Sequence, residues 1–328
     1  MKFSIGTNIK EGPWGGGNLF AKNLIEYLRL QGHEVVNHLL DDDIDLILIT
    51  EPRRTSESSA FTHMDVIDYL NYVKSETLIV HRINECDERK GTNFVNKYLI
   101  GANSVADQTV FVSDWLMTLY LDQGLNTKNN RVIMAGANNE IFNNKGLDVW
   151  NKNSKLKIVT HHWGANWNKG FDAYSKLDDL LSFEDWKEKI DFTYIGNLPK
   201  KFEFKNAQFI PPLSGIDLAN KLKENHLYIT GSINEPSGNH HIEAAQCGLP
   251  LLYINSGGMP EYCAEYGIEF NIDNLEIKLN EMIENYEDYF NKLKDYRFNS
   301  EIMSREYEEL FIHMINNKEE YLSKRTID

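Results

Sequence analysis

Short apolar runs alternate with helical patterns over residues 1–145. Phe20, Leu24 and Leu28 recur every four residues in the first helical pattern, which Asn18 can cap. Strands separated by helices are typical of a parallel sheet with crossover helices. We therefore expect a doubly wound α/β domain here. The apolar runs are KFSIGTNI, EVVNHLL, DLILIT, TLIVHRI, QTVFVS and RVIMAG.

A polar segment, residues 143–155, interrupts this alternation, and the pattern then restarts. The later apolar runs are LKIVTHH, DFTYIG, AQFIP, HLYITGS and PLLYIN, followed by an acidic helical pattern. We expect an N-terminal domain at 1–148, a second Rossmann-like domain at 149–300, and a final helix at 301–328 that crosses back to the first domain. Two such sheets facing each other would share one cleft at the carboxyl ends of their strands.

Length and composition are those of a two-domain globular protein, since 328 residues suffice for two cores. The net charge of −15 argues against a broad basic face for nucleic acid or anionic lipid. Three scattered cysteines indicate neither a disulfide framework nor a zinc site. With no signal-peptide pattern and no apolar run long enough to span a bilayer, we expect a cytoplasmic enzyme.

A glycine-rich loop, EGPWGGGN, joins the first strand to the first helix at residues 11–18. Gly16 and Gly17 let backbone amides approach a ligand without side-chain obstruction. The glycine spacing fits neither the dinucleotide fingerprint nor the P-loop. The loop is therefore either a ligand-binding turn or a flexible tight connection.

The stretch THHWGANWNKGFD occupies the equivalent place in the second domain, with Lys169 at the approach to a helix. An ammonium and a helix N-terminus can act on the same phosphate. A solvated surface lysine is the alternative.

Two carboxylates flank a turn in EPSGNHHIEAAQCGLP, residues 235–250. Glu235 lies in the loop, and Glu243 falls in the helix that Asn239 can cap. The amides of Gly238, Asn239 and His240 would face an anion at the helix end, while carboxylates accept hydrogen bonds from sugar hydroxyls. Alternatively, Glu243 merely favours the positive end of the helix dipole.

Two further stretches complete the candidate site. Gly258 lies in a glycine turn, SGGMPEY, which can pass close to a pyrophosphate, and His81 ends a first-domain strand, where it would point into the cleft. A structural histidine is the alternative there. The adjacent histidine pairs at 161–162 and 240–241 lack the spacing of metal ligands, and DDDID at 41–45 is better interpreted as a solvated loop, so we expect no metal site.

Together these stretches resemble the retaining glycosyltransferases of the GT-B fold, particularly glycosyltransferase family 4. The resemblance spans nearly the whole chain and rests on GPWGGGN, ADQTVFVSDWL, VIMAGANNEIF, NKG at 168–170, and the Glu235 to Glu243 stretch through GLP and SGGMPE. It implies two Rossmann-like domains and a hexosyl- or deoxyhexosyltransferase that needs no metal and no cofactor. The implied partners are a UDP- or GDP-sugar and a glycan-type acceptor.

The resemblance also implies roles for single residues. Lys169 would contact the donor diphosphate, Glu243 the ribose hydroxyls, and Glu235 the transferred sugar. His81 would lie near the donor sugar. The turn at Gly238, Asn239 and His240 would lie against sugar or phosphate, Gly16 and Gly17 near the diphosphate and acceptor, and Asn166 and Gly258 beside the donor.

The chain departs from this family before Lys169, where the family often has an arginine and this sequence has Trp163 and Gly164. The second phosphate contact would then come from another group. The candidates are His162, Asn166, Lys200 and Lys201.

The expected function is thus a retaining, metal-independent transfer of sugar from a nucleoside diphosphate to a hydroxyl. A non-catalytic two-domain protein that binds a nucleotide or a sugar is the alternative. A nicotinamide-dependent dehydrogenase ranks third, because the glycine spacing argues against it.

Overall fold

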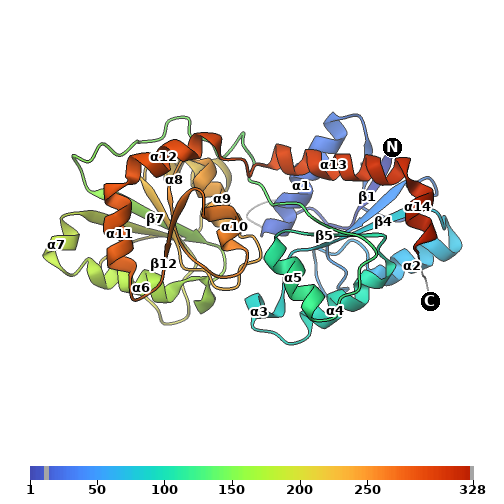
Figure 1. Cartoon of the computed structure of the whole chain (residues 1–328), viewed down its shortest axis with the longest axis horizontal. Helices are drawn as coiled ribbons and strands as arrows, with labels where there is room; N and C mark the ends of the chain where they lie inside the picture. Colours follow the sequence, from blue (N-terminus) through green and yellow to red (C-terminus); the bar gives the residue numbers. More distant parts are fainter. Residues whose placement is uncertain (11–14, 326–328) are drawn as a thin grey trace. The chain divides into compact units, whose positions relative to one another are not determined.

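The structure, a computed structural model, describes residues 1–10 and 15–325. The chain forms two compact units (Figure 1). Met1–Ala135 and the chain from Ser300 onward make the first unit, and Gly136–Asn299 makes the second. Each unit has its own sheet and its own core.

The first unit has a six-stranded sheet in the order β2-β1-β3-β4-β5-β6, in which every pair is parallel. The chain order reverses between β1 and β3, which makes the carboxyl ends of these two strands the topological switch point. Its elements are β1 (Lys2–Ile5), α1 (Gly16–Leu30), β2 (Glu34–Val36), β3 (Leu46–Ile49), α2 (His63–Tyr72), β4 (Leu78–Ile83), α3 (Asp87–Lys90), α4 (Val95–Ala102), η1 (Asn103–Val105), β5 (Gln108–Phe111), α5 (Asp114–Asp122), β6 (Asn130–Val132), α13 (Ser300–Asn316) and α14 (Lys318–Ser323).

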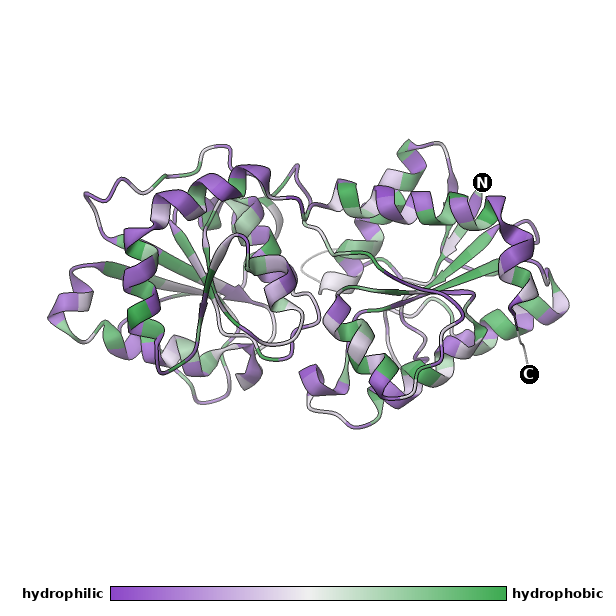
Figure 2. Cartoon of the chain, viewed as in Figure 1, coloured by the Kyte–Doolittle hydropathy of each residue, from purple (hydrophilic) through white to green (hydrophobic). Residues whose placement is uncertain are grey.

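Helices cover both faces of this sheet. On one face, α1 and α13 pack against each other and against β1, β3 and β4, and the rings of Phe3 and Phe311 lie 5.2 Å apart. On the other face, α2 packs on Ile47, Ile49 and Ile79. Figure 2 shows apolar colour along the strands and striped helices, the pattern of elements that bury one side.

The second unit has a six-stranded parallel sheet in the order β12-β11-β10-β7-β8-β9. Here the chain order reverses between β7 and β10, so ligand-binding loops are expected after these two strands. Its elements are β7 (Leu156–His162), η2 (Trp167–Lys169), α6 (Phe171–Leu180), α7 (Glu184–Lys187), β8 (Ile190–Gly196), β9 (Gln208–Ile210), α8 (Gly215–Lys223), β10 (Leu227–Thr230), α9 (Asn239–Gln246), β11 (Leu251–Ile254), α10 (Met259–Cys263), β12 (Gly267–Phe270), α11 (Leu275–Glu284), α12 (Tyr286–Lys292) and η3 (Leu293–Asp295).

The predicted fold class is confirmed, since both halves are α/β units with parallel sheets. The polar segment 143–155 packs on the second unit. The amide of Asp148 donates to the carbonyl of Lys223 at 3.0 Å, and the Trp150 ring meets the Tyr286 ring edge-on at 5.2 Å. The chain therefore passes into the second unit at Gly136, ahead of the segment that the sequence marks as a linker.

The start of α1 differs from the prediction. Its N-cap is Gly15, and Asn18 lies inside the helix. The Asn18 side chain instead bonds both backbone groups of Lys10, at 2.8 and 2.9 Å. Asn18 thus holds Lys10, in the loop that follows β1, beside the helix. Residues 11–14 of that loop lie outside the described part of the chain. Within the described residues, no helix has the length and apolar character needed to cross a bilayer.

Candidate functional site

Lys169 and Glu235 meet at the switch point of the second sheet. Lys169 ends the short η2 turn that follows β7, and Glu235 lies in the loop after β10. The Lys169 ammonium is 3.1 Å from the Glu235 carboxylate, and the two side chains are 16% and 11% exposed. Residues that are 66 apart in sequence thus form one largely buried ion pair at the edge where ligands of such sheets bind.

Glycines bring the two loops this close. Gly170 has φ +108°, and a Cβ there would lie 2.7 Å from the backbone of Gly231. A Cβ on Gly164 would lie 3.3 Å from Cε of Lys169. Gly164 therefore leaves room for the Lys169 side chain.

A third loop supports Glu235 from the backbone side. The amide of Gly258 donates to the Glu235 carbonyl at 2.8 Å, and the amide of Asn234 donates to Ser256 Oγ at 2.8 Å. Gly257 has φ +67°, and a Cβ there would lie 2.5 Å from the Glu235 carbonyl oxygen. Gly258 therefore lies in the predicted cluster, where it holds the Glu235 loop.

The N-terminus of α9 lies between the two carboxylates. Asn239 is its first residue rather than its cap, and the N-cap is Gly238, with φ +75° and no side-chain capping bond. The first amides of α9 therefore have no side-chain acceptor at the cap, which leaves them suited to an anion. The His240 side chain turns inward, with Nε2 2.9 Å from Thr230 Oγ1. Burial, aided by nearby His162, holds the pKa of His240 well below its usual range.

Glu243 lies within α9 and faces the end of β7. Its Oε2 is 2.9 Å from Nε2 of His161, and the side chains of Glu243 and His161 are 8% and 9% exposed. The sequence suggested neither this partner nor the pairing, because His161 stood out only as one of two adjacent histidines. Its position at the carboxyl end of a switch-point strand is the signal that would have found it.

Tyr174 is a second residue that the sequence did not reveal. Its buried hydroxyl donates to the Lys169 carbonyl at 2.9 Å, accepts from the Gly231 amide at 3.2 Å, and lies 2.6 Å from His162 Nε2. One hydroxyl of α6 therefore ties together the two loops that carry Lys169 and Glu235.

In the first unit, Gly16 and Gly17 line a hollow of about 540 Å³ at the carboxyl ends of β1, β3 and β4. Two of its charged lining residues, Glu85 and Lys90, contact each other, and Glu85 also contacts Arg53 outside the hollow. Arg82 also lines it, and its guanidinium lies 3.8 Å over the Phe20 ring.

The predicted orientation of His81 is wrong. Neighbouring residues of a strand point to opposite faces, and Arg82, not His81, reaches the hollow. His81 is fully buried, with Nδ1 2.8 Å from Asn103 Oδ1. Its burial and its contact with Asn103 favour the structural role that was the alternative. Burial lowers its pKa to about 4.

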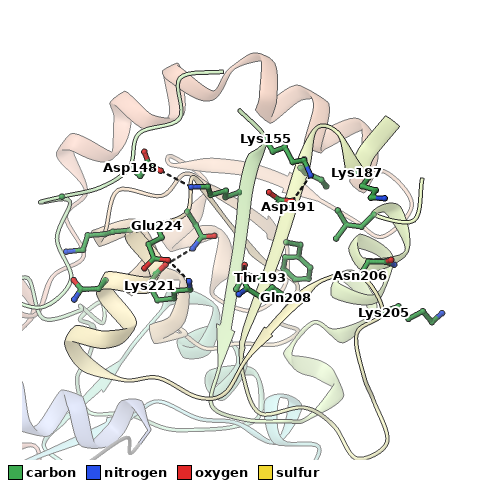
Figure 3. A pocket seen from close by; sticks show the side chains of 18 of the residues that line it. Asp148, Lys155, Lys187, Asp191, Thr193, Lys205, Asn206, Gln208, Lys221 and Glu224 are labelled. Atoms are coloured by element: carbon green, nitrogen blue, oxygen red, sulfur yellow. Dashed lines mark hydrogen bonds and ion pairs between the residues drawn. The ribbon is translucent and has the colours of Figure 1, made fainter. Parts of the chain in front are cut away.

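A larger hollow, of about 990 Å³, lies at the opposite, amino-terminal edge of the second sheet (Figure 3). Its lysines are largely paired with adjacent carboxylates, such as Lys155 with Asp191 at 3.2 Å and Lys221 with Glu224 at 2.6 Å. None of the predicted site residues lines it. We therefore place the candidate site of this unit at the carboxyl edge of its sheet, where Lys169, Glu235 and Glu243 lie.

The groups considered for a second phosphate contact differ in exposure. Asn166, Lys200 and Lys201 are exposed, whereas His162 is buried against Tyr174. In the described ranges 1–10 and 15–325, no three His, Cys, Asp or Glu side chains are grouped so as to hold a metal ion.

Comparison with known proteins gives one match to a family model and several similar structures. Residues 192–299 match the model of the glycosyl transferases group 1 family. No curated protein matches the sequence. A glycosyltransferase from Rickettsia africae matches 96% of the chain and 99% of its own length, with TM-score 0.68 and 13% identity.

Two cyanobacterial structures are similar to the same extent. Anabaena Alr3699/HepE, solved in complex with UDP-glucose, matches 95% of the chain and 100% of its own length, with TM-score 0.68 and 12% identity. Sucrose-phosphate synthase from Thermosynechococcus elongatus matches 96% and 99%, with TM-score 0.64 and 12% identity. Residues 192–299 thus match the glycosyl transferases group 1 family model, and the chain as a whole has the GT-B fold.

Proposed function

We propose that this protein is a retaining glycosyltransferase that moves a sugar from a nucleoside diphosphate to a hydroxyl of a glycan-type acceptor without a metal ion. The observation that carries the proposal is the Lys169–Glu235 pair, 3.1 Å apart beside the uncapped N-terminus of α9. It combines one cation, one carboxylate and amide donors at the switch point of a sheet, and the carboxylate and the amides lie in the segment that matches the glycosyl transferases group 1 model.

Each group would bind one part of such a donor. Departure of the diphosphate leaves negative charge on its β-phosphate, and the Lys169 ammonium together with the α9 amides would stabilise that charge. Glu235 would then accept hydrogen bonds from the transferred sugar, and Glu243 from the ribose. Lys169 is already held beside Glu235, so the diphosphate and the sugar would meet between them.

The same arrangement supports two further parts of the proposal: the anomeric configuration of the sugar is retained, and no metal ion is needed. An acceptor that arrives on the face from which the diphosphate departs retains the configuration, and a phosphate oxygen can take the acceptor's proton. No protein base is then required. The leaving charge would be met by Lys169 and the helix rather than by a divalent cation.

The first test is a thermal-shift panel of nucleoside diphosphates and nucleotide sugars. A ligand at 100 times its Kd adds about 2.7 kcal/mol to stability, which is a readily measured shift. Because HepE was solved with UDP and with UDP-glucose, the uridine series comes first and the guanosine series second. A panel in which nothing shifts the melting temperature would contradict the proposal.

The second test is donor turnover, followed over time with and without EDTA. We expect hydrolysis or transfer that persists in EDTA, and a product with the anomeric configuration of the donor by NMR. Binding without turnover would favour the non-catalytic alternative.

A lysine variant ties the activity to this site. Lys169→Gln keeps an amide donor for Glu235 but removes the charge, and it should lower turnover about 10² to 10³-fold. Lys187→Gln, on the distant α7, is the matched control and should leave turnover unchanged. Equal turnover in both variants would remove Lys169 from the site.

A further inference from the structure

We infer that His161 is a positioning residue for donor recognition: it fixes the Glu243 carboxylate so that one oxygen remains available to the ribose hydroxyls. This inference rests on the proposed function, since it assigns a ribose to Glu243. It adds a residue that the glycine turns and carboxylate spacing do not point to.

The two oxygens of the Glu243 carboxylate have different surroundings. Oε2 of Glu243 lies 2.9 Å from Nε2 of His161. Within the described residues, Oε1 makes no hydrogen bond to a protein group, and it is not fully buried. Oε1 is therefore the atom that a ligand hydroxyl can reach and bond.

His161 is itself held rigidly. Its backbone amide donates to the Tyr228 hydroxyl at 3.1 Å, and that hydroxyl lies 3.2 Å from its carbonyl oxygen. The Tyr228 ring also meets the imidazole edge-on at 5.5 Å. Because β7 carries His161 and α9 carries Glu243, their bond also ties a central strand to the helix that supplies the anion-binding amides.

The polarity of the bond is fixed by chemistry. An ionised carboxylate only accepts, so Nε2 of His161 must carry the proton. Nδ1 is buried and, within the described residues, has no hydrogen-bond partner. Among the described residues, the imidazole of His161 therefore makes a single hydrogen bond, which it donates to Glu243.

Removal of this donor should act on the ribose and on little else. Without it, Oε2 is left buried and unsatisfied, and the carboxylate is free to rotate. That rotation withdraws Oε1 from its position. The groups proposed for the diphosphate, Lys169 and the first amides of α9, make no hydrogen bond with the His161 imidazole in the described residues, so we expect them to keep their geometry.

The experiment compares uridine diphosphate with its 2′,3′-dideoxy analogue by isothermal titration. We expect the wild-type protein to prefer the ribonucleotide about tenfold or more. His161→Phe keeps the ring volume and loses the donor, so it should lose that preference while its affinity for the dideoxy analogue stays unchanged. His161→Gln, whose amide reaches the place of Nε2, should restore most of the preference.

Two outcomes separate this inference from the proposed function. If the wild type prefers the ribonucleotide and His161→Phe retains that preference, His161 does not position Glu243, although the function stands. If the wild type binds both ligands equally, no ribose contact exists and the assignment of Glu243 fails together with this inference. Should the uridine pair not bind, the guanosine pair is used.

A third variant guards against misfolding. If His161→Phe does not fold, His161→Asn replaces it, because its amide is one methylene shorter than that of Gln and stops short of Glu243. A loss of ribose preference in Asn but not in Gln supports the inference, and equal behaviour overturns it. His226→Phe, directly before β10, is a matched control for replacing a buried histidine of the same unit and should keep the wild-type preference.

Discussion

At the scale of single residues, the two carboxylates of the candidate site differ in the partner that holds them. Glu235 is paired with a lysine, and Glu243 with a histidine. Their positions, one in a loop and one in a helix, were predictable from proline, glycine and helical spacing. Their partners were not, because each comes from a segment more than 60 residues away whose approach depends on sheet order.

Because their partners differ, replacing each glutamate with glutamine should affect ligand binding differently. Glu235→Gln takes away the carboxylate that pairs with Lys169, so the ammonium becomes available to phosphate. We expect unchanged or tighter binding of free nucleoside diphosphate but poorer use of the full donor. Glu243→Gln should weaken both ligands, because each contains a ribose. Isothermal titration of both variants with both ligands measures these changes in affinity.

One result would contradict the assignment of Glu235 to the sugar and Glu243 to the ribose. If Glu235→Gln loses as much affinity for the bare diphosphate as Glu243→Gln does, Glu235 supports the phosphate turn rather than the sugar. Circular dichroism of each variant checks that the change does not unfold the second unit.

Buried histidines also give the fold a pH dependence. Burial lowers the pKa of His81 to about 4 from an ordinary value of 6.5. Between these pH values the unfolded chain binds a proton that the native chain does not, so stability falls as pH falls from 6.5 towards 4. One such group contributes a slope of about 1.4 kcal/mol per pH unit inside that window.

Replacement of His81 tests this directly. His81→Gln keeps a hydrogen-bonding amide near Asn103 but does not titrate, so its free energy of unfolding should depend less steeply on pH between 6 and 4.5. Urea unfolding at several pH values gives the slopes. A variant with the wild-type slope would show that His81 is not protonated on unfolding in this range.

At the scale of elements, hydrophobic patterning located eleven of the twelve strands found in residues 1–10 and 15–325, because buried parallel strands are short continuous apolar runs. The missed strand, β12, is only Gly267–Phe270 at the sheet edge, and its exposed Glu269 interrupts the run. Helix starts were less predictable. Asn18 and Asn239 are favoured capping residues, yet glycines take the caps of α1 and α9.

Glycine turns between elements offer a matched pair of substitutions. Gly257→Ala would bring a Cβ to 2.5 Å from the Glu235 carbonyl at φ +67°, whereas Gly32 has φ +85° with no atom within 4 Å of such a Cβ. Gly32→Ala should cost about 1 to 2 kcal/mol from backbone strain alone. Gly257→Ala should cost more and should also weaken nucleotide binding, since it displaces the Glu235 loop.

Thermal unfolding and nucleotide titration of both variants measure these effects. Equal losses of stability in the two, with unchanged nucleotide affinity, would show that the contact between the 256–258 turn and the Glu235 loop does not shape the site.

At the scale of the whole molecule, the chain leaves the first unit at Ala135 and returns to it at Ser300. Polar composition suggested a linker at 143–155, but composition does not show that Trp150 and Asp148 have partners in the second unit. The returning helix α13 is different, because its apolar stripe must be covered by some core. Met303, Tyr307 and Phe311 are buried in the first.

Two phenylalanine substitutions test whether the units unfold separately. Phe311→Ala empties a fully buried site of the first core, and Phe270→Ala empties a site of the second that is 2% exposed. Each should cost about 3 to 5 kcal/mol. Amide hydrogen exchange should show protection lost in β1, β3 and β4 for Phe311→Ala, although residue 311 follows the whole second unit in sequence, and lost in β7, β10 and β11 for Phe270→Ala. Loss in both sheets from either substitution would mean that the two cores unfold as one cooperative unit.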